Sequence, residues 1–292
     1  MMRSMLFVPG NVEHRLAKAL QLPADALIID LEDSVPLTEK AAARNLATIA
    51  LREQRRGLAY VRVNALATGM TIEDLNAVVL EGLDGIVLSK TEEAADLLKI
   101  DWYLNHLENK LGLPAGGIDL IPLVENSRGV INASDICAAV PRVKRICFGA
   151  IDYTADLGVK LTETGTELHY ARSHLVNVSR AAGLEGPIDT VYPEIKNLEG
   201  YERDVRLGAA LGFQGKLVLH PGQIEPANRI FSPTAEEIAM ARKIVAAFEE
   251  AEARGSAAIT LENGKFIDYP VARSARRTLE IAAQIEAKES SI

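Results

Sequence analysis

The chain has 292 residues, of which 48% are hydrophobic, 25% charged and 5% aromatic. These values are those of an ordinary globular protein and exclude a disordered, collagen-like or coiled-coil chain. The formal net charge of −8 argues against a basic surface for nucleic acid or anionic membranes. No apolar stretch approaches the ~20 residues of a membrane helix, and the N-terminal apolar run is too short for a signal peptide. We therefore expect a cytoplasmic protein without nucleic-acid or membrane partners.

Short, nearly continuous apolar runs alternate with helical patterns along most of the chain. Such runs are typical of strands buried on both faces of a parallel sheet. The predicted strands are Ser4–Val8, Ala26–Asp30, Ala59–Val63, Gly85–Leu88, Asp119–Val124, Arg145–Phe148, Ile188–Tyr192 and Lys216–Leu219. The stretches between them are rich in Ala, Leu, Glu, Lys and Arg and predict helical crossovers, for example over 36–56, 70–82, 91–112 and 126–140.

Eight such repeats predict a (β/α)8 TIM barrel. The structural rival is an open, doubly wound parallel sheet, which would need a reversal of strand order that a sequence does not display. We favour the barrel because the count of eight agrees with it.

The alternation stops after the eighth run. Thr234 and Glu237 form a capping-box pair at the start of a long amphipathic helix. Asn263-Gly264 predicts a small hairpin within 257–268, and a last helix follows it. We therefore expect a barrel domain over 1–232 and a C-terminal helical and hairpin extension over 233–292 that acts as a lid.

Polar residues follow most of the predicted strands, at the rim where barrel enzymes build their active sites. They are Glu32 and Asp33 after the second strand, Arg62 and Asn64 at the third, Lys90 after the fourth, Glu125 after the fifth, Asp152 after the sixth and His220 after the eighth. Carboxylates without Cys or an HExxH pair favour a hard cation such as Mg²⁺ over Zn²⁺. Each acid alone could be a helix N-cap, but their common rim favours a functional site.

Motifs for other chemistries are missing from the sequence. It has no GxGxxG after a strand, no GxxxxGK[ST] and no GxSxG elbow. Nucleotide hydrolysis and Rossmann-type redox chemistry are therefore not expected.

The chain resembles the citrate lyase β-subunit and HpcH/HpaI aldolase family, which includes malyl-CoA and citramalyl-CoA lyases. The resemblance extends over nearly the whole length and depends on the order and spacing of its motifs. The motifs are Arg3–Gly10, Ile29–Val35, Val61–Asn64, Val124–Asn126, Phe148–Asp152, Asp156–Gly158, Gly215-Lys216, His220-Pro221 and Gly264–Asp268. The chain departs from the family pattern at Ile151, where many relatives carry an acid.

The resemblance implies a Mg²⁺-dependent carbon–carbon lyase of the oxo-acid-lyase type, with Mn²⁺ as a possible substitute. It would cleave a 3-hydroxyacyl-CoA such as malyl-CoA or citramalyl-CoA into acetyl-CoA and an α-keto acid, or form the thioester from these two. One alternative is a citrate lyase β-subunit that needs an acyl-carrier-protein partner. Another is a silent barrel that binds a CoA ester. The sequence also leaves open the particular thioester and whether the net outcome is thioester hydrolysis.

The resemblance also implies roles for individual residues. Glu125 and Asp152 match the two metal ligands of the family, and Arg62 matches its substrate-binding and catalytic arginine. Glu32 and Asp33 are expected beside the metal and the substrate.

Other residues have weaker assignments. Arg15 and Lys18 share a face of the first helix at i, i+3 and are candidates for the CoA phosphates. A lysine at a strand end is more often a salt-bridge partner than a site residue, and we expect this of Lys90. We expect His220 to be a structural hydrogen-bonding residue rather than a base. Asp268 matches a catalytic acid that reaches the site from a neighbouring subunit in the malyl-CoA lyase branch.

The C-terminal extension carries two apolar helix stripes that must be buried. The chain's own barrel offers a place for one, and a neighbour's barrel for the other. We therefore expect a homo-oligomer, a trimer or a hexamer, whose active sites are completed by Asp268 of another subunit.

Overall fold

The computed structural model describes residues 1–261 and 264–290. It divides into two compact units, one from Met2 to Arg229 and one that contains Met1 and the chain from Ile230 on. The division lies close to the boundary expected at residue 232.

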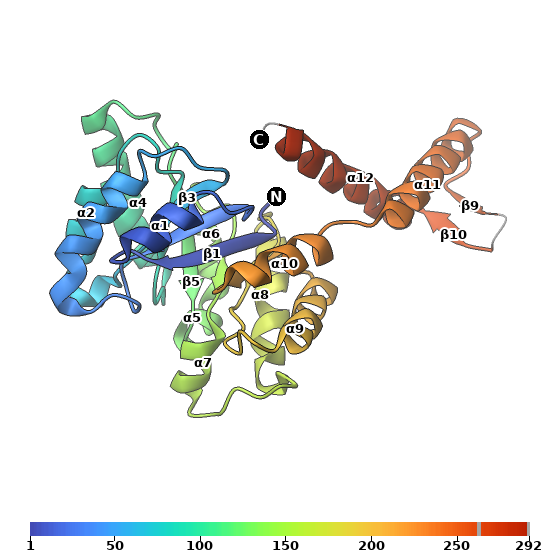
Figure 1. The fold of residues 1–292 in the computed structure, drawn as a ribbon. Coiled ribbons are helices and arrows are strands. Elements are labelled where there is room, and N and C mark those ends of the chain that lie inside the picture. Colours follow the sequence, from blue (N-terminus) through green and yellow to red (C-terminus); the bar gives the residue numbers. More distant parts are fainter. Residues whose placement is uncertain (262–263, 291–292) are drawn as a thin grey trace. The chain divides into compact units, whose positions relative to one another are not determined.

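The first unit is a closed barrel of eight parallel strands in sequential order, surrounded by helices (Figure 1). The predicted (β/α)8 barrel is thus confirmed, and the open, doubly wound sheet is wrong. The strands are β1 (Ser4–Pro9), β2 (Ala26–Asp30), β3 (Leu58–Val63), β4 (Gly85–Leu88), β5 (Asp119–Val124), β6 (Cys147–Phe148), β7 (Ile188–Asp189) and β8 (Gly215–Val218).

Strands β6 and β7 are shorter than their apolar runs suggest. The run expected over Ile188–Tyr192 leaves the ladder after Asp189, and Thr190 and Val191 instead line a cavity at the end of the barrel. The register between β2 and β3 sets Asp30 opposite Arg62. The ladder itself therefore brings an acid and a base together at the carboxyl rim.

The helices of the barrel unit are α1 (Glu13–Ala19), α2 (Lys40–Ala50), α3 (Thr71–Val78), α4 (Ala94–Leu111), α5 (Ser127–Ile131), α6 (Ala133–Ala138), α7 (Ala150–Leu157), α8 (His169–Ala181), α9 (Leu198–Leu211) and α10 (Ile224–Ile230). Short 3₁₀ helices are η1 (Leu37–Glu39), η2 (Leu66–Thr68), η3 (Thr166–Leu168) and η4 (Pro221–Gln223). In the described part of the chain, none of the helices combines the length and apolarity needed to cross a bilayer.

The single helix expected over 126–140 is wrong. Two short helices, α5 and α6, take its place and meet at Asn132. The side-chain amide of Asn132 donates a 2.9 Å hydrogen bond to the backbone carbonyl of Glu92. This bond to a distant segment holds Asn132 at the junction between the two helices.

The barrel interior is packed with apolar side chains from all of its strands, as in other barrels of this type. The buried cluster is Met2, Met5, Ala26, Ile28, Tyr60, Val87, Ile121, Leu123, Cys147, Ile188 and Leu217. Polar groups close its amino end, where the Tyr60 hydroxyl donates a 2.9 Å hydrogen bond to Asp119, which also pairs with Arg145. The carboxyl end is left for the cavity described below.

The second unit contains α11 (Ala235–Ala253), β9 (Ala258–Thr260), β10 (Phe266–Asp268) and α12 (Tyr269–Ser290). The predicted capping box is present, since Thr234 and Glu237 exchange hydrogen bonds at the start of α11. The two strands form the expected antiparallel hairpin, whose Asn263 lies outside the described residues. The helices and hairpin share a small core of Ala241, Ile244, Phe248, Ile267, Ala272 and Ala275.

Candidate metal and substrate site

A cavity of about 450 Å³ lies at the carboxyl ends of the barrel strands. Its polar lining comprises Arg15, Asp30, Asp33, Ser34, Arg62, Glu125, Asp152 and Thr190. Its apolar lining includes Phe7, Leu123, Ile151, Val191, Leu217 and Leu219. The volume is in the range of small-molecule sites, and few polar groups converge within apolar walls, as is usual for such sites.

Arg62 projects from β3 into this cavity and is held by two acids. Its Nε and one terminal nitrogen donate bidentate hydrogen bonds of 2.7 and 2.6 Å to Asp30, and its other terminal nitrogen lies 3.1 Å from Glu32. The guanidinium also stacks 4.8 Å from the centroid of the Phe7 ring. A guanidinium has five N–H donors, so two remain for a substrate anion.

Asp30 serves as the anchor of this arrangement. Burial alone would raise the pKa of Asp30, but the hydrogen bonds and charge of Arg62 outweigh burial and hold that pKa below its ordinary value. Asp30 also accepts the backbone N–H groups of Glu32 and Ser34 at 2.9 and 3.1 Å. One ionised carboxylate thus fixes both the arginine and the turn that follows β2.

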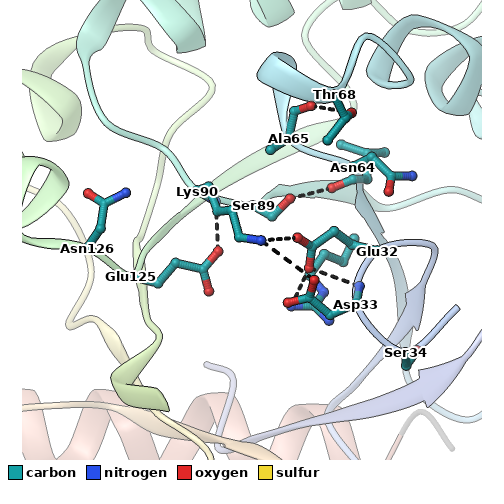
Figure 2. Close-up of polar contacts among 12 residues, drawn as sticks. Glu32, Asp33, Ser34, Asn64, Ala65, Thr68, Ser89, Lys90, Glu125 and Asn126 are labelled. Atoms are coloured by element: carbon teal, nitrogen blue, oxygen red, sulfur yellow. Dashed lines mark hydrogen bonds and ion pairs between the residues drawn. The ribbon is translucent and has the colours of Figure 1, made fainter. Parts of the chain in front are cut away.

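Glu32 and Asp33 are brought together with Lys90 from the end of β4 (Figure 2). The Lys90 ammonium lies 2.9 Å from Glu32 and 3.6 Å from Asp33. Glu32 is buried between Lys90 and Arg62, whereas the Asp33 side chain is 53% exposed. Burial raises the pKa of Glu32 despite the two neighbouring cations.

Glu125 follows β5 and is only 2% exposed. Its Oε1 accepts a 2.8 Å hydrogen bond from the backbone N–H of Lys90. Gly149 leaves the space for this carboxylate, because a Cβ there would lie 2.7 Å from Oε2 of Glu125. Burial, together with the charge of Asp152, raises the pKa of Glu125 to about 8, although Arg62 acts in the opposite direction.

Asp152 lies in the first turn of α7 and lines the same cavity. Within residues 1–261 and 264–290, neither Asp152 nor Glu125 forms an ion pair. Thr190 accepts the backbone N–H of Ala150 at 2.8 Å and so ties the start of α7 to the end of β7. The structure thus places two carboxylates without ion-pair partners in the lining of one cavity.

This donor set fits a hard divalent cation. Five carboxylates meet three cationic side chains in and around the cavity, so negative charge is in excess. In the described residues no three His, Cys, Asp or Glu side chains form a complete metal cage. Mg²⁺ is usually held by one or two carboxylates and keeps several waters, and Glu125 and Asp152 offer that open arrangement.

Arg15 and Lys18, the pair expected to bind CoA phosphates, differ in their surroundings. Arg15 lines the cavity, whereas Lys18 is exposed on α1 and is not part of the lining. His220 caps η4 through its Nδ1, which accepts the backbone N–H of Gly222 at 3.1 Å.

Asp268 belongs to the second unit, at the end of β10. Its Oδ1 accepts a 3.1 Å hydrogen bond from the backbone N–H of Val271 in the first turn of α12. This contact is that of a helix cap. It occupies one carboxylate oxygen and fixes the direction of the side chain.

Sequence reasoning left several contributors out of the site. The sequence places Asp30 at the end of the second predicted strand, but only the structure shows that it is the bidentate partner of Arg62. Lys40 is buried beneath the turn, where its ammonium donates to the carbonyls of Leu31 and Glu32 and to Asn64, at 2.7 to 2.8 Å. Thr190 gave no signal, because a threonine at a strand end has no particular chemistry.

Comparison with known proteins identifies the family of the chain. The family model HpcH/HpaI aldolase/citrate lyase matches residues 3–221. The chain is 38% identical to citrate lyase subunit beta of Leuconostoc mesenteroides subsp. cremoris over 96% of this chain and 93% of that protein. It is 33% identical to the human mitochondrial citramalyl-CoA lyase over 98% of this chain and 87% of that enzyme.

Among solved structures, the protein CitE of Mycobacterium tuberculosis in complex with magnesium, acetoacetate and coenzyme A is similar. The identity is 31%, the TM-score 0.77, and the match covers 96% of this chain and 97% of that one. A match to the family model over most of the chain, together with these relatives, shows that the chain belongs to the HpcH/HpaI aldolase/citrate lyase family.

Proposed function

We propose that the protein is a Mg²⁺-dependent carbon–carbon lyase that cleaves a 3-hydroxyacyl-CoA of the malyl-CoA or citramalyl-CoA type into acetyl-CoA and an α-keto acid. The observation that carries the proposal is the pairing of two unpaired carboxylates, Glu125 and Asp152, with an arginine that has spare donors, in one cavity. The relatives include lyases, and the similar CitE structure contains magnesium and coenzyme A.

Glu125 and Asp152 would hold the metal, which when bound would act as a Lewis acid toward the carboxylate and carbonyl oxygens of the keto acid. The chain's own contribution is to place both carboxylates in one cavity, where burial disfavours an ionised Glu125 that has no cation beside it. Phe7, Leu123 and Leu217 give the cavity apolar walls, which lower the local dielectric constant and strengthen these interactions.

Cleavage breaks the bond between C2 and C3 of the thioester. The C3 hydroxyl gives up its proton to water and becomes the carbonyl of the keto acid, and the electron pair of the broken bond stays on the acyl fragment as an enolate. Arg62 can stabilise the enolate oxygen with its remaining N–H groups, because Asp30 and Glu32 hold the guanidinium in place before the charge develops. No covalent nucleophile is needed, in agreement with the absence of a catalytic triad motif from the sequence.

The enolate carbon must then accept a proton, and we propose Asp268 as the acid. Asp268 lies in the second unit, and the family resemblance favours delivery from a neighbouring subunit in a trimer or hexamer. Arg15 is the candidate contact for the CoA phosphates, with Lys18 as a second cation on the same helix.

A citrate lyase β-subunit is the second candidate. The 38% identity to citrate lyase subunit beta favours it. In that case the thioester would be carried by an acyl carrier protein rather than by CoA. A barrel that binds CoA esters without turnover is the third possibility.

The deciding experiment is incubation of the purified chain alone with malyl-CoA, citramalyl-CoA and citryl-CoA, with and without Mg²⁺. We expect an α-keto acid and acetyl-CoA from at least one thioester, and no product after chelation of the metal. Free CoA in place of acetyl-CoA would reveal a thioesterase. Cleavage that appears only when a carrier protein bears the acyl group would support the second candidate and contradict the first.

Completion of the site in trans has its own test. Chains with Arg62→Ala and with Asp268→Ala are each expected to be inactive. Their co-assembly should restore activity, because some mixed sites contain both wild-type residues. An active monomer in light scattering, or no restoration in a verified mixed oligomer, would contradict this arrangement.

A further inference from the structure

Lys90 has an unusual backbone conformation. In the described part of the chain it is the one non-glycine residue with positive φ, at 51°. This left-handed region crowds the Cβ of an L-residue against its own carbonyl, so it is uncommon outside glycine. Strained residues of this kind persist where the surroundings force them, and they concentrate at functional sites.

The surroundings of Lys90 do force the conformation. The hydroxyl of Ser89 donates to the carbonyl of Val63 at 2.7 Å, and the hydroxyl of Thr91 donates to the carbonyl of Leu88 at 2.9 Å. The backbone N–H of Thr91 reaches the carbonyl of Leu123 at 3.2 Å. The residues on both sides of Lys90 are therefore tied to the ends of three neighbouring strands, and Lys90 takes up the resulting bend.

The bend directs the two ends of Lys90 toward opposite sides of the site (Figure 2). Its backbone N–H points to Oε1 of Glu125, whereas its ammonium reaches Glu32 and Asp33. Among the described residues this N–H is the one hydrogen-bond donor to the Glu125 carboxylate. A single residue thus connects the acid that follows β5 with the acids that follow β2.

We propose that Lys90 is a positioning residue with two separable tasks. Its left-handed backbone orients the Glu125 carboxylate toward the metal, and its ammonium neutralises Glu32 so that an anionic substrate can approach. This inference rests on the proposed function, because it takes Glu125 as a metal ligand and the substrate as a carboxylate. It adds a backbone conformation to the determinants of metal binding.

The backbone task is tested with variants that all lack the ammonium but differ in their tolerance of positive φ. Lys90→Gly and Lys90→Asn accept that conformation, whereas Lys90→Val does not. The probe is Mn²⁺ alone, with its affinity measured by titration calorimetry and electron paramagnetic resonance. We expect Lys90→Gly to stay within about 3-fold of wild type and Lys90→Val to bind about 10–100-fold more weakly, as is usual when a partner of a metal ligand is lost.

Lys90→Ala is the second variant in case Lys90→Val does not fold. Alanine is strained less than valine at this φ, so we expect its Mn²⁺ affinity to fall between those of Lys90→Gly and Lys90→Val. Thermal unfolding identifies any variant that is not folded. Equal Mn²⁺ affinities for the glycine and alanine variants would overturn the backbone task.

The ammonium task is tested by steady-state kinetics. Lys90→Gly should raise the KM for the thioester by about 10-fold or more, because the site becomes more negative, with kcat within about 3-fold of wild type. Lys90→Arg should restore KM because it restores the charge. An unchanged KM in Lys90→Gly, or no recovery in Lys90→Arg, would overturn this task.

Lys144→Gly is the matched control. Lys144 lies 3.6 Å from the buried Asp119, at the amino end of the barrel, so this change removes the same charge far from the cavity. Mn²⁺ affinity and KM should stay unchanged in that variant. If the wild-type protein binds Mn²⁺ but cleaves no thioester, only the proposed function is contradicted. If the Lys90 variants bind Mn²⁺ equally well, only the backbone inference is contradicted.

Discussion

Two buried clusters of acids and bases in the barrel unit have similar composition but differ in charge balance. The ring cluster, formed by Arg172, Asp189, Asp204 and Lys216, lies between the barrel and helices α8 and α9. Each of its two acids contacts both of its two cations. The rim cluster around Arg62 has more acids than bases, and two of its acids form no ion pair in the described structure.

This difference separates a structural cluster from a functional one. Burial of charge is costly unless the charge is paired, so a balanced ring needs no further partner. The attraction of Lys216 and Arg172 outweighs burial and lowers the pKa of Asp204. In the rim cluster, burial and the charge of Asp152 raise the pKa of Glu125 to about 8. The unbalanced cluster is therefore the one prepared to receive a cation.

The largest expected effect comes from removal of the unbalanced charge. Glu125→Gln keeps the shape of the side chain but loses a metal ligand. We expect lyase activity to fall on the order of a thousandfold or more, since a Lewis acid contributes several kcal/mol to such reactions. The free energy of unfolding of the metal-free protein should not fall, because burial disfavours the ionised form of Glu125 and glutamine has no such form. Mn²⁺ titration, kinetics and urea unfolding check these outcomes, and wild-type metal affinity in the variant would refute the assignment.

In the ring cluster we expect a substitution to lower the stability of the protein and to leave its metal affinity unchanged. Asp189→Asn neutralises one of the two acids that Arg172 and Lys216 share, and Asp204 alone then leaves one buried positive charge without compensation. The free energy of unfolding should fall by about 3–5 kcal/mol. In the protein that remains folded, Mn²⁺ affinity should be unchanged. A lower Mn²⁺ affinity of the folded fraction would show that the two clusters are coupled.

Replacement of the arginine in each cluster gives a paired comparison. Arg62→Lys cannot keep two bonds to Asp30 and still reach Glu32 and the substrate, because lysine carries a single point charge. We expect kcat/KM to fall by about 10²–10³-fold, the effect of losing one preorganised donor. Arg172→Lys should lower the thermal unfolding temperature and leave kcat/KM of the folded enzyme near wild type. Steady-state assays and calorimetry on both variants measure the contrast.

The clusters should also respond to pH in opposite directions. The pKa of Asp204 is lower in the folded state, so its contribution to stability is present above about pH 4 and is lost as pH falls through the folded-state pKa. The pKa of Glu125 is raised to about 8, so the metal-free protein loses stability as pH rises from about 5 to 8.

Comparison with Glu125→Gln isolates the Glu125 effect. The stability advantage of the metal-free variant over wild type should grow by on the order of 1–3 kcal/mol between pH 5 and pH 8. Saturating Mg²⁺ should remove that advantage, because the metal favours the ionised carboxylate. Parallel stability curves for the two proteins would contradict the raised pKa.

Much of the fold could be predicted from the sequence because each strand is buried on both faces and reads as an apolar run. The capping box at Thr234 and Glu237 could be predicted because its hydrogen bonds join residues three apart. The helix break at Asn132 could not, because its partner Glu92 lies 40 residues away in the chain. Local interactions are visible in a sequence, whereas those between distant segments are not.

The candidate site shows the same division. Glu125, Asp152 and Arg62 could be named from the sequence because they lie at or just after strand ends, and the carboxyl ends of parallel strands meet at one rim. Asp189 also ends a strand, yet its side chain pairs with Arg172 of α8 and Lys216 of β8. Position along the strand therefore predicts the level of a residue in the barrel but not its charge partners.

The sequence by itself determined the eight-stranded barrel, the family and the acids of its rim, because these depend on hydrophobic pattern and residue order. Only the tertiary structure decided which acids are paired and which are not. It set Asp30 against Arg62 through the register of two strands, and it bent Lys90 into a left-handed conformation that faces Glu125. Charge balance depends on distances between residues far apart in the chain, and those distances exist only once the barrel has closed.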